Sequence, residues 1–163
     1  MIDLLTRDYG PDSRNRLADT AGEADEAALA ALETFYFALN HADLDALAAV
    51  WADDPLAQLD NPVGGILRGR LAIVELYRRV FDSGLDLQVT FTDAMQVRTP
   101  DTLVVSGREL GSYRAGGQRV PLTIRTTRVL GATADGWRMV HHHGSIDDAE
   151  ALAAYQRAVR NGR

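Results

Sequence analysis

The run of three histidines at 141–143 is the feature of this chain best suited to proton transfer, because an imidazole titrates near neutral pH. These histidines lie in the segment GWRMVHHHGS, residues 136–145, which is predicted to be a strand. Side chains alternate along a strand, so one face is expected to carry Trp137, Met139, His141 and His143. His142 is expected to face the other way, toward a contact between subunits. His141 or His143 is therefore the predicted general base.

The other basic side chains restrict the chemistry further. All 17 are arginines, and the chain has no lysine and no cysteine. Schiff-base chemistry, disulfides, thiolate metal sites and a cysteine nucleophile are thereby excluded. Guanidinium groups suit carboxylates and phosphates. Between residues 102 and 145 six arginines face only two acids, and these arginines are Arg108, Arg114, Arg119, Arg125, Arg128 and Arg138.

Length and composition indicate one water-soluble globular domain. The chain has 163 residues, of which 46% are hydrophobic and 25% charged, and no apolar run is long enough to span a membrane. A net charge of −6 argues against a nucleic-acid partner. The opening MIDLLTRDYG does not have the pattern of a secretory signal, so a cytoplasmic location is expected.

The pattern of apolar residues changes from a helical period to a period of two along the chain. Residues 1–22 are polar and are expected to form a loose arm. Residues 23–146 are expected to form the domain, with helices from Glu23 to His41, from Asp43 to about Trp51, and after Gly69 as far as Ser83. Strands are expected at about 85–97, 103–113, 118–130 and 137–145, and a C-terminal helix in 147–163.

This order of elements predicts an α+β fold, with three N-terminal helices packed on one face of a strongly curved antiparallel sheet and a C-terminal helix added. The other face of such a sheet would be left bare. We therefore expect a homodimer that covers it.

The strings DNPVGG, RGR and GWRMVHHHGS, together with ALETFYFALNHADLDALAAVWADD, resemble the nuclear transport factor two-like superfamily and, within it, the SnoaL-like branch. The resemblance covers residues 23–145. It implies a cone-shaped α+β barrel around a pocket that binds a small molecule. It does not imply a single reaction, because this fold hosts many unrelated activities.

The catalytic residues of two enzymes of the superfamily are not all matched in this chain. The resemblance places the base, tyrosine and acid of ketosteroid isomerase on Asn61, Phe35 and Arg125. It places the two aspartates of limonene epoxide hydrolase on Leu110 and Met139, whereas Asn61 and Arg108 match that enzyme's asparagine and arginine. Neither mechanism is therefore expected.

The same comparison predicts the pocket. Its proposed reactive residues are His141, His143, Arg125, Arg108 and Asn61, and its walls are Phe35, Trp51, Val63, Tyr77, Phe81 and Met139. In this interpretation the arginines hold an anion or carbonyl oxygen, a histidine moves the proton and Asn61 orients substrate or water. The resulting hypothesis is an acid–base isomerase, cyclase or hydratase without a cofactor, acting on an apolar substrate.

Two alternatives stay open. Arg108 and Arg125 could instead pair with a buried acid such as Glu33 or Asp60. The protein could also be a non-catalytic ligand-binding or association module of the same fold. No metal site is predicted, since only Asp60 could join His141 and His143 as a third ligand.

Overall fold

The computed structural model describes residues 1–19 and 24–161 of the chain. In these residues the helices are α1 (Ala24–His41), α2 (Leu44–Val50), α3 (Arg70–Asp82) and α4 (Ala149–Asn161). The strands are β1 (Ile2–Leu5), β2 (Gln58–Asp60), β3 (Leu67–Arg68), β4 (Gln88–Arg98), β5 (Thr102–Ala115), β6 (Gln118–Thr133) and β7 (Gly136–Ser145).

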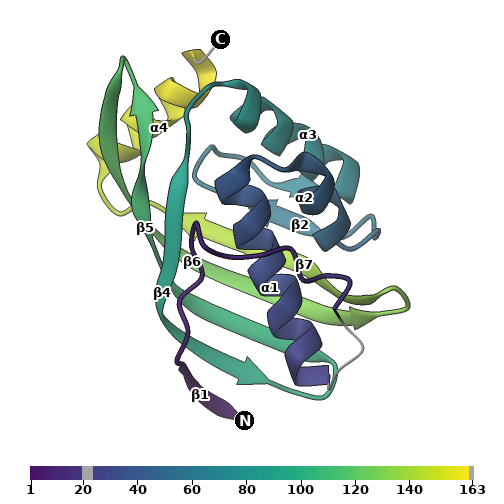
Figure 1. The fold of residues 1–163 in the computed structure, drawn as a ribbon. Helices are drawn as coiled ribbons and strands as arrows, with labels where there is room; N and C mark the ends of the chain where they lie inside the picture. Colours follow the sequence, from purple (N-terminus) through teal and green to yellow (C-terminus); the bar gives the residue numbers. More distant parts are fainter. Residues whose placement is uncertain (20–23, 162–163) are drawn as a thin grey trace.

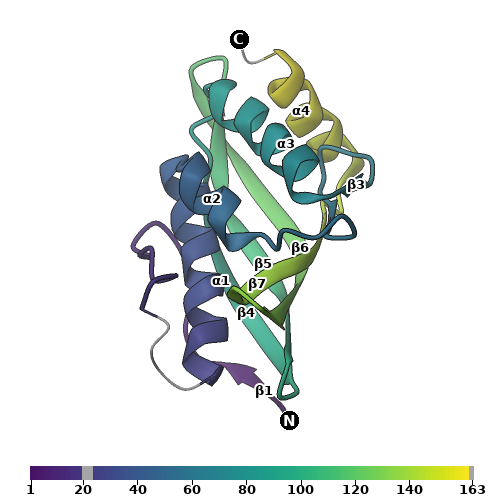
Figure 2. The ribbon, with the colours of Figure 1, turned by 90° about the vertical axis from the view of Figure 1, so that its right-hand side faces the viewer.

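The strands form one curled sheet in the order β1-β4-β5-β6-β7-β2-β3, which does not close on itself. Neighbouring strands are antiparallel except β2 and β7, which run parallel, so the sheet is mixed rather than wholly antiparallel as expected. Helices α1, α2 and α3 lie on its concave side (Figures 1 and 2). The result is the cone-shaped α+β fold that the sequence predicted, with α4 at the wide end beside the β5–β6 hairpin.

Two local features bend the long strands. Strand β4 carries a bulge between Thr92 and Met95, where Asp93 adopts a φ of 50° opposite Gly107. A Cβ on Gly107 would lie 2.8 Å from the carbonyl oxygen of Thr92, so the bulge needs a glycine there. A second bulge lies in β7, between the pairs that Val129 and Leu130 form with it. Bulges increase strand twist and bend the bulged strand, which explains the curl of the sheet.

The core fills the space between the sheet and α1. The buried face of α1 carries small alanines with Leu32, Phe35 and Tyr36, which lets the helix approach the strands closely. Asn40 fixes the end of α1 to β4, because its amide group donates to the Val89 carbonyl and accepts from the Val89 N–H. In the described residues, no helix has the length and apolar character needed to cross a membrane.

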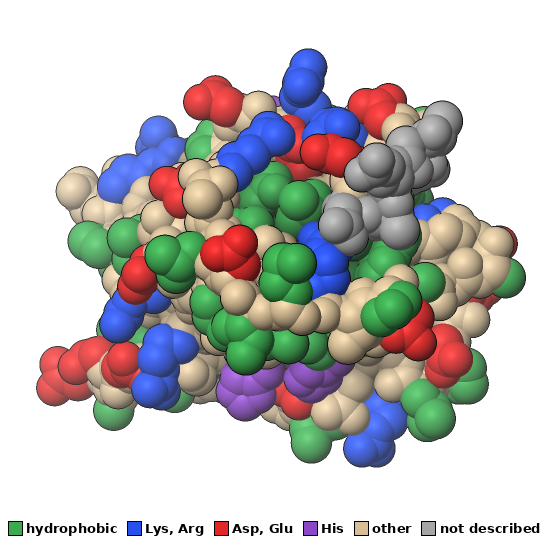
Figure 3. Space-filling model, turned by 90° about the horizontal axis from the view of Figure 1, so that it is seen from below, with side chains coloured by type: hydrophobic (Ala, Val, Ile, Leu, Met, Phe, Trp, Pro, Cys, Tyr) green, Lys and Arg blue, Asp and Glu red, His purple; other side chains and the backbone are tan. Residues whose placement is uncertain are grey.

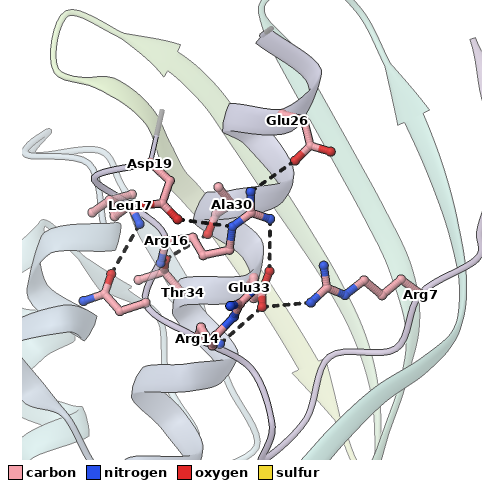
Figure 4. A network of polar contacts seen from close by, with 10 residues as sticks. Arg7, Arg14, Arg16, Leu17, Asp19, Glu26, Ala30, Glu33 and Thr34 are labelled. Carbon is pink, nitrogen blue, oxygen red and sulfur yellow. Dashed lines mark hydrogen bonds and ion pairs between the residues drawn. The ribbon is translucent and has the colours of Figure 1, made fainter. Parts of the chain in front are cut away.

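The N-terminal segment, expected to be a loose arm, contains a strand that extends the sheet, since Ile2–Leu5 pairs with β4. The chain then crosses α1 and is held by Glu33, whose side chain is fully buried. The Glu33 carboxylate accepts hydrogen bonds from the Arg7 guanidinium at 2.9 Å, the Arg14 backbone at 3.2 Å and the Arg16 guanidinium at 3.4 Å (Figure 4). Glu23, where the first helix was expected to begin, lies outside the described residues.

Candidate functional site

The bulge in β7 reverses the predicted orientation of the three histidines. Trp137 and Met139 face the core as expected, but Val140 is the extra residue of the bulge, and alternation resumes one position later. His142 is therefore buried, whereas His143 is exposed and His141 half-exposed. The expectation that His141 and His143 face the interior and His142 faces outward is wrong. Histidine side chains are visible at the surface beside apolar ones in Figure 3.

Arg108 and Arg125 also face outward, contrary to the expectation that they line the pocket. They pair directly across β5 and β6 on the convex face, with about half of each side chain exposed. Arg108 lies 3.6 Å from the carboxylate of Asp93, and Arg125 lies 2.6 Å from that of Asp147. The acids that the alternative interpretation named, Glu33 and Asp60, are therefore not their partners. A surface cavity of about 400 Å³ brings Arg108, Arg125 and His143 together outside the cone.

The side chain of Asn61, which was predicted to orient substrate or water, forms a hydrogen bond within its own turn. Its side-chain oxygen accepts the backbone N–H of Val63 at 3.0 Å and so holds the turn after β2. Val63 lines a groove at the surface, and half-buried Phe81 lines another cavity at the end of α3. The remaining residues predicted as pocket walls are buried in the core, and these are Phe35, Trp51, Tyr77 and Met139.

Another arginine occupies the interior. Arg128 of β6 is fully buried, and its guanidinium donates to the Glu109 carboxylate, to the Tyr36 hydroxyl and, at 3.2 Å, to the Thr126 hydroxyl. Tyr36 also donates to Glu109 at 3.1 Å. A buried ion pair avoids a large desolvation penalty only when its remaining donors and acceptors form hydrogen bonds. Most donors and acceptors of the Arg128–Glu109 pair do so.

Aromatic rings enclose the ion pair. The Arg128 guanidinium carbon lies 4.4 Å from the centre of the Phe35 ring and 4.6 Å from that of Tyr36, both within cation–π range. Burial opposes the charge on Arg128, but the interactions with Tyr36 and Glu109 outweigh it and raise the pKa of the guanidinium. Burial raises the pKa of Tyr36 well above its ordinary value. Arg128 is therefore a permanent cation beside neutral phenol groups.

His142 is the direct cross-strand neighbour of Arg128 on the inner face. One ring nitrogen, Nδ1, lies 3.4 Å from the Tyr77 hydroxyl, and the ring packs edge-on against Phe35. Burial lowers the pKa of His142 well below its ordinary value, and the charge of Arg128 acts in the same direction. At neutral pH the imidazole is consequently uncharged.

Among the residues that the structure describes, Arg128 and His142 each have one ring or guanidinium nitrogen without a hydrogen-bond partner. Within the described residues, Arg128 Nε and His142 Nε2 are buried and have no hydrogen-bond partner. Buried polar groups in folded proteins nearly always have one, so such atoms require an explanation. Facing residues in a sheet have Cβ atoms only about 5 Å apart, so these two side chains are neighbours on the inner face.

Helix α4 lies at the wide end of the cone, beside the β5–β6 hairpin (Figure 1). In the described part of α4, Tyr155 is the buried side chain, and it packs edge-on against Tyr113 of β5 with ring centres 5.3 Å apart. Burial raises the pKa of Tyr155, and the negative charge of Glu109 acts in the same direction. Gln156 donates to the Pro62 carbonyl at 3.0 Å and holds the helix to the turn after β2.

The alternation of residues in β6 indicates that Arg128 faces inward, although the family resemblance pointed to Arg125. In β6 the buried apolar residues Leu122, Ile124 and Leu130 all have even numbers. Alternation therefore places Arg128 inside and Arg125 outside. No comparable signal marked His142, because a bulge in the middle of a strand has no clear mark in its residue types.

The described residues bring no three His, Asp or Glu side chains together as a metal site. Asp60, the third ligand considered from the sequence, accepts a hydrogen bond from Gln58 at 3.0 Å.

Comparison with known families agrees with this architecture. The model of the SnoaL-like domain matches residues 28–149, which include most of α1 and all the long strands. The chain belongs to the SnoaL-like domain family. Its fold is that of the nuclear transport factor 2-like proteins, as the sequence predicted. The comparison with curated proteins gave no match.

Several solved structures share the SnoaL-like fold. A protein of Thiobacillus denitrificans, named a putative calcium/calmodulin-dependent protein kinase type II association domain, is 32% identical, with a TM-score of 0.60 over 74% of this chain and 94% of that one. A nuclear transport factor 2-like superfamily protein of Salmonella enterica is 20% identical, with a TM-score of 0.64 over 75% and 89% of the two chains. A Caulobacter vibrioides protein with a cystatin-like fold is 21% identical, with a TM-score of 0.62 over 85% and 99%.

Proposed function

We propose that this SnoaL-like protein binds a small, neutral carbonyl compound in the interior of the cone, at Arg128 and His142. The observation that carries this proposal is the pair of buried, partnerless nitrogen atoms on these two facing residues. A ligand oxygen between them would satisfy both. The surrounding rings of Phe35 and Tyr77 supply the apolar walls typical of small-molecule sites.

The hydrogen-bonding roles favour a carbonyl oxygen. Arg128 Nε carries a hydrogen and can only donate. If Nδ1 of the neutral imidazole accepts from the Tyr77 hydroxyl, then Nε2 of His142 carries the hydrogen and also donates. Two donors without partners need an acceptor, which a ketone, aldehyde or ester oxygen provides. The positive charge of Arg128 is already balanced by Glu109, so a second anion is not required.

In this proposal His142, whose side chain faces the interior, replaces His141 and His143 as the histidine of the site, and it acts as a hydrogen-bond donor rather than as the base. A carbonyl oxygen held by the Arg128 and His142 donors is polarised, which makes the adjacent C–H more acidic. Isomerisation, cyclisation and dehydration next to a carbonyl are the reaction types that such a pair supports.

The proposal is tested by thermal unfolding with acetophenone and, as an anionic compound of similar size, benzoate. Acetophenone is expected to raise the melting temperature saturably, because a ligand of the folded state stabilises it. The His142→Leu variant should lose this shift, whereas Leu110→Ala, at an exposed position on the outer face of β5, should keep it. A shift of equal size in the His142→Leu variant would refute binding at this site.

We propose, secondly, that the convex face of the sheet binds a second copy of the chain. The register places Ile2, Val97, Val104 and Val129 in one row across four strands, with Leu4 and Met95 in the next row. Ile2 and Leu4 are 73% and 71% exposed. An apolar patch of this extent is typical of an association surface. The name of the Thiobacillus denitrificans relative refers to an association domain, which supports this candidate.

Analytical ultracentrifugation tests this association. The full chain is expected to sediment as a dimer at about 50 µM, a concentration at which micromolar affinity suffices. Val129→Arg should give a folded monomer, and Leu71→Arg, an exposed position on α3, should remain dimeric. A monomeric wild-type protein at this concentration would exclude the proposed dimer.

A further inference from the structure

We propose that the groove between α3 and α4 binds an amphipathic carboxylate, such as a medium-chain fatty acid. This groove is separate from the interior site and has a volume of about 560 Å³, within the usual range for small-molecule sites. It lies at the wide end of the cone. Its lining comes from α3, from α4 and from the segment that joins β2 to β3 and ends at Leu67, the first residue of β3.

The floor of the groove is apolar. Leu76 is buried on α3, and Val63, Leu67 and Val159 are half-buried side chains from the other two segments. They belong to the hydrophobic core or pack against it. An alkyl chain lying on this floor would remove apolar surface of both partners from water, which is the main source of affinity for such a ligand.

Two exposed arginines lie at the rim of the groove. Arg79 is in the last turn of α3 and Arg160 in the last turn of α4. Within residues 1–19 and 24–161, neither forms an ion pair, whereas Arg70 and Arg78, also on α3, are paired with acids. Asp82 is the one acid in the lining, so the charged groups of the groove carry a net positive charge in a protein of net charge −6.

This charge pattern selects the head group of the ligand. A carboxylate can accept hydrogen bonds from guanidinium groups in a planar, paired geometry. A cationic head group would be repelled by two arginines and attracted by one aspartate. A helix C-terminus also favours arginine, but that effect does not require the two side chains to lie beside one apolar groove.

Isothermal titration calorimetry with decanoate tests the proposal on the full chain. We expect saturable binding of one decanoate and markedly weaker binding of decyltrimethylammonium, which has the same chain and the opposite charge. The double variant Arg79→Gln/Arg160→Gln should lower the affinity for decanoate about tenfold, which is what two partly exposed ion pairs supply. Val159→Glu, which places a carboxylate in the floor, should abolish binding.

The matched control is Arg78→Gln/Arg157→Gln. It removes the same charge from the same two helices, but Arg78 and Arg157 line other cavities. This control should bind decanoate as the wild type does. Equal losses in the two double variants, equal binding of the cationic compound, or no saturable binding would each overturn the proposal. His142→Leu should retain decanoate binding, which separates this groove from the interior site.

Discussion

Removing the positive charge of Arg128 is expected to be far more damaging than removing that of Arg108, although both arginines lie in neighbouring strands and pair with an acid. The Arg128→Met variant leaves the Glu109 carboxylate buried, at 2% exposure, with the Tyr36 hydroxyl as its one remaining partner among the described residues. Breaking a buried ion pair in this way costs about 3–5 kcal/mol. Arg108→Met disrupts an exposed pair with Asp93, for which about 1 kcal/mol or less is expected.

The assay is equilibrium unfolding in urea, supported by thermal melts. For a chain of this size 1 kcal/mol corresponds to about 2–4 °C, so Arg128→Met should lower the melting temperature by about 6–20 °C. Adding Glu109→Gln should recover about 2 kcal/mol, because a neutral amide can stay buried against the Tyr36 hydroxyl.

The double-mutant cycle decides between charge and packing. A coupling of about 2 kcal/mol or more between the two positions is expected from a desolvated ion pair. If Arg128→Met proves no more destabilising than Arg108→Met, the reasoning from burial is refuted. If it is destabilising but additive with Glu109→Gln, Arg128 acts through its packing against the aromatic rings rather than through its charge.

Three further predictions concern stability. The lowered pKa of His142 means that the unfolded chain takes up a proton that the folded chain cannot, so stability should be lost as pH falls below about 6.5, by up to about 1.4 kcal/mol per pH unit. In His142→Leu, the urea midpoints measured at pH 7.5 and at pH 5.5 should therefore lie closer together than in the wild type. An unchanged pH dependence would contradict this assignment. Gly111→Ala should cost about 2 kcal/mol or more, since a Cβ there would lie 1.9 Å from the Gln88 carbonyl oxygen, whereas Gly131→Ala, with 3.5 Å to its nearest neighbour, should be nearly neutral in the same melts. Glu33→Gln should lower the free energy of unfolding by about 1–3 kcal/mol and speed hydrogen exchange in residues 1–19, whereas Glu26→Gln, at an exposed position, should change little. Similar exchange in both variants would show that the segment does not depend on Glu33.

Periodicity predicted the long elements well because each has enough residues to show its period. The four strands of the meander and α1 to α3 lie within a few residues of their expected bounds. The short strands were harder to predict. In Ile2–Leu5 three of the four side chains are exposed, so this strand is held by backbone pairing with β4 and shows no alternation between buried and exposed residues.

The candidate site shows how a one-residue error changes the chemistry. A shift of one position in a strand moves every side chain to the opposite face. Resemblance located the correct strands, and each carries an inward-facing polar residue close to the expected one, with Glu109 beside Arg108 and Arg128 three positions after Arg125. In β6 the alternation of apolar residues was sufficient to choose the correct face. In β7 alternation itself failed, since the bulge at Val140 shifted His142 inward.

The corrected orientations also change the ligand that the interior would accept. An interior holding two arginines and two histidines would attract an anion. The interior observed pairs one guanidinium with the buried carboxylate of Glu109, so these two charges cancel. A carboxylate entering beside them would be an additional buried charge without a counterion, at a cost of several kcal/mol. A neutral carbonyl oxygen would meet the free donors of Arg128 and His142 without that cost, and for this reason the proposed interior site should prefer acetophenone to benzoate.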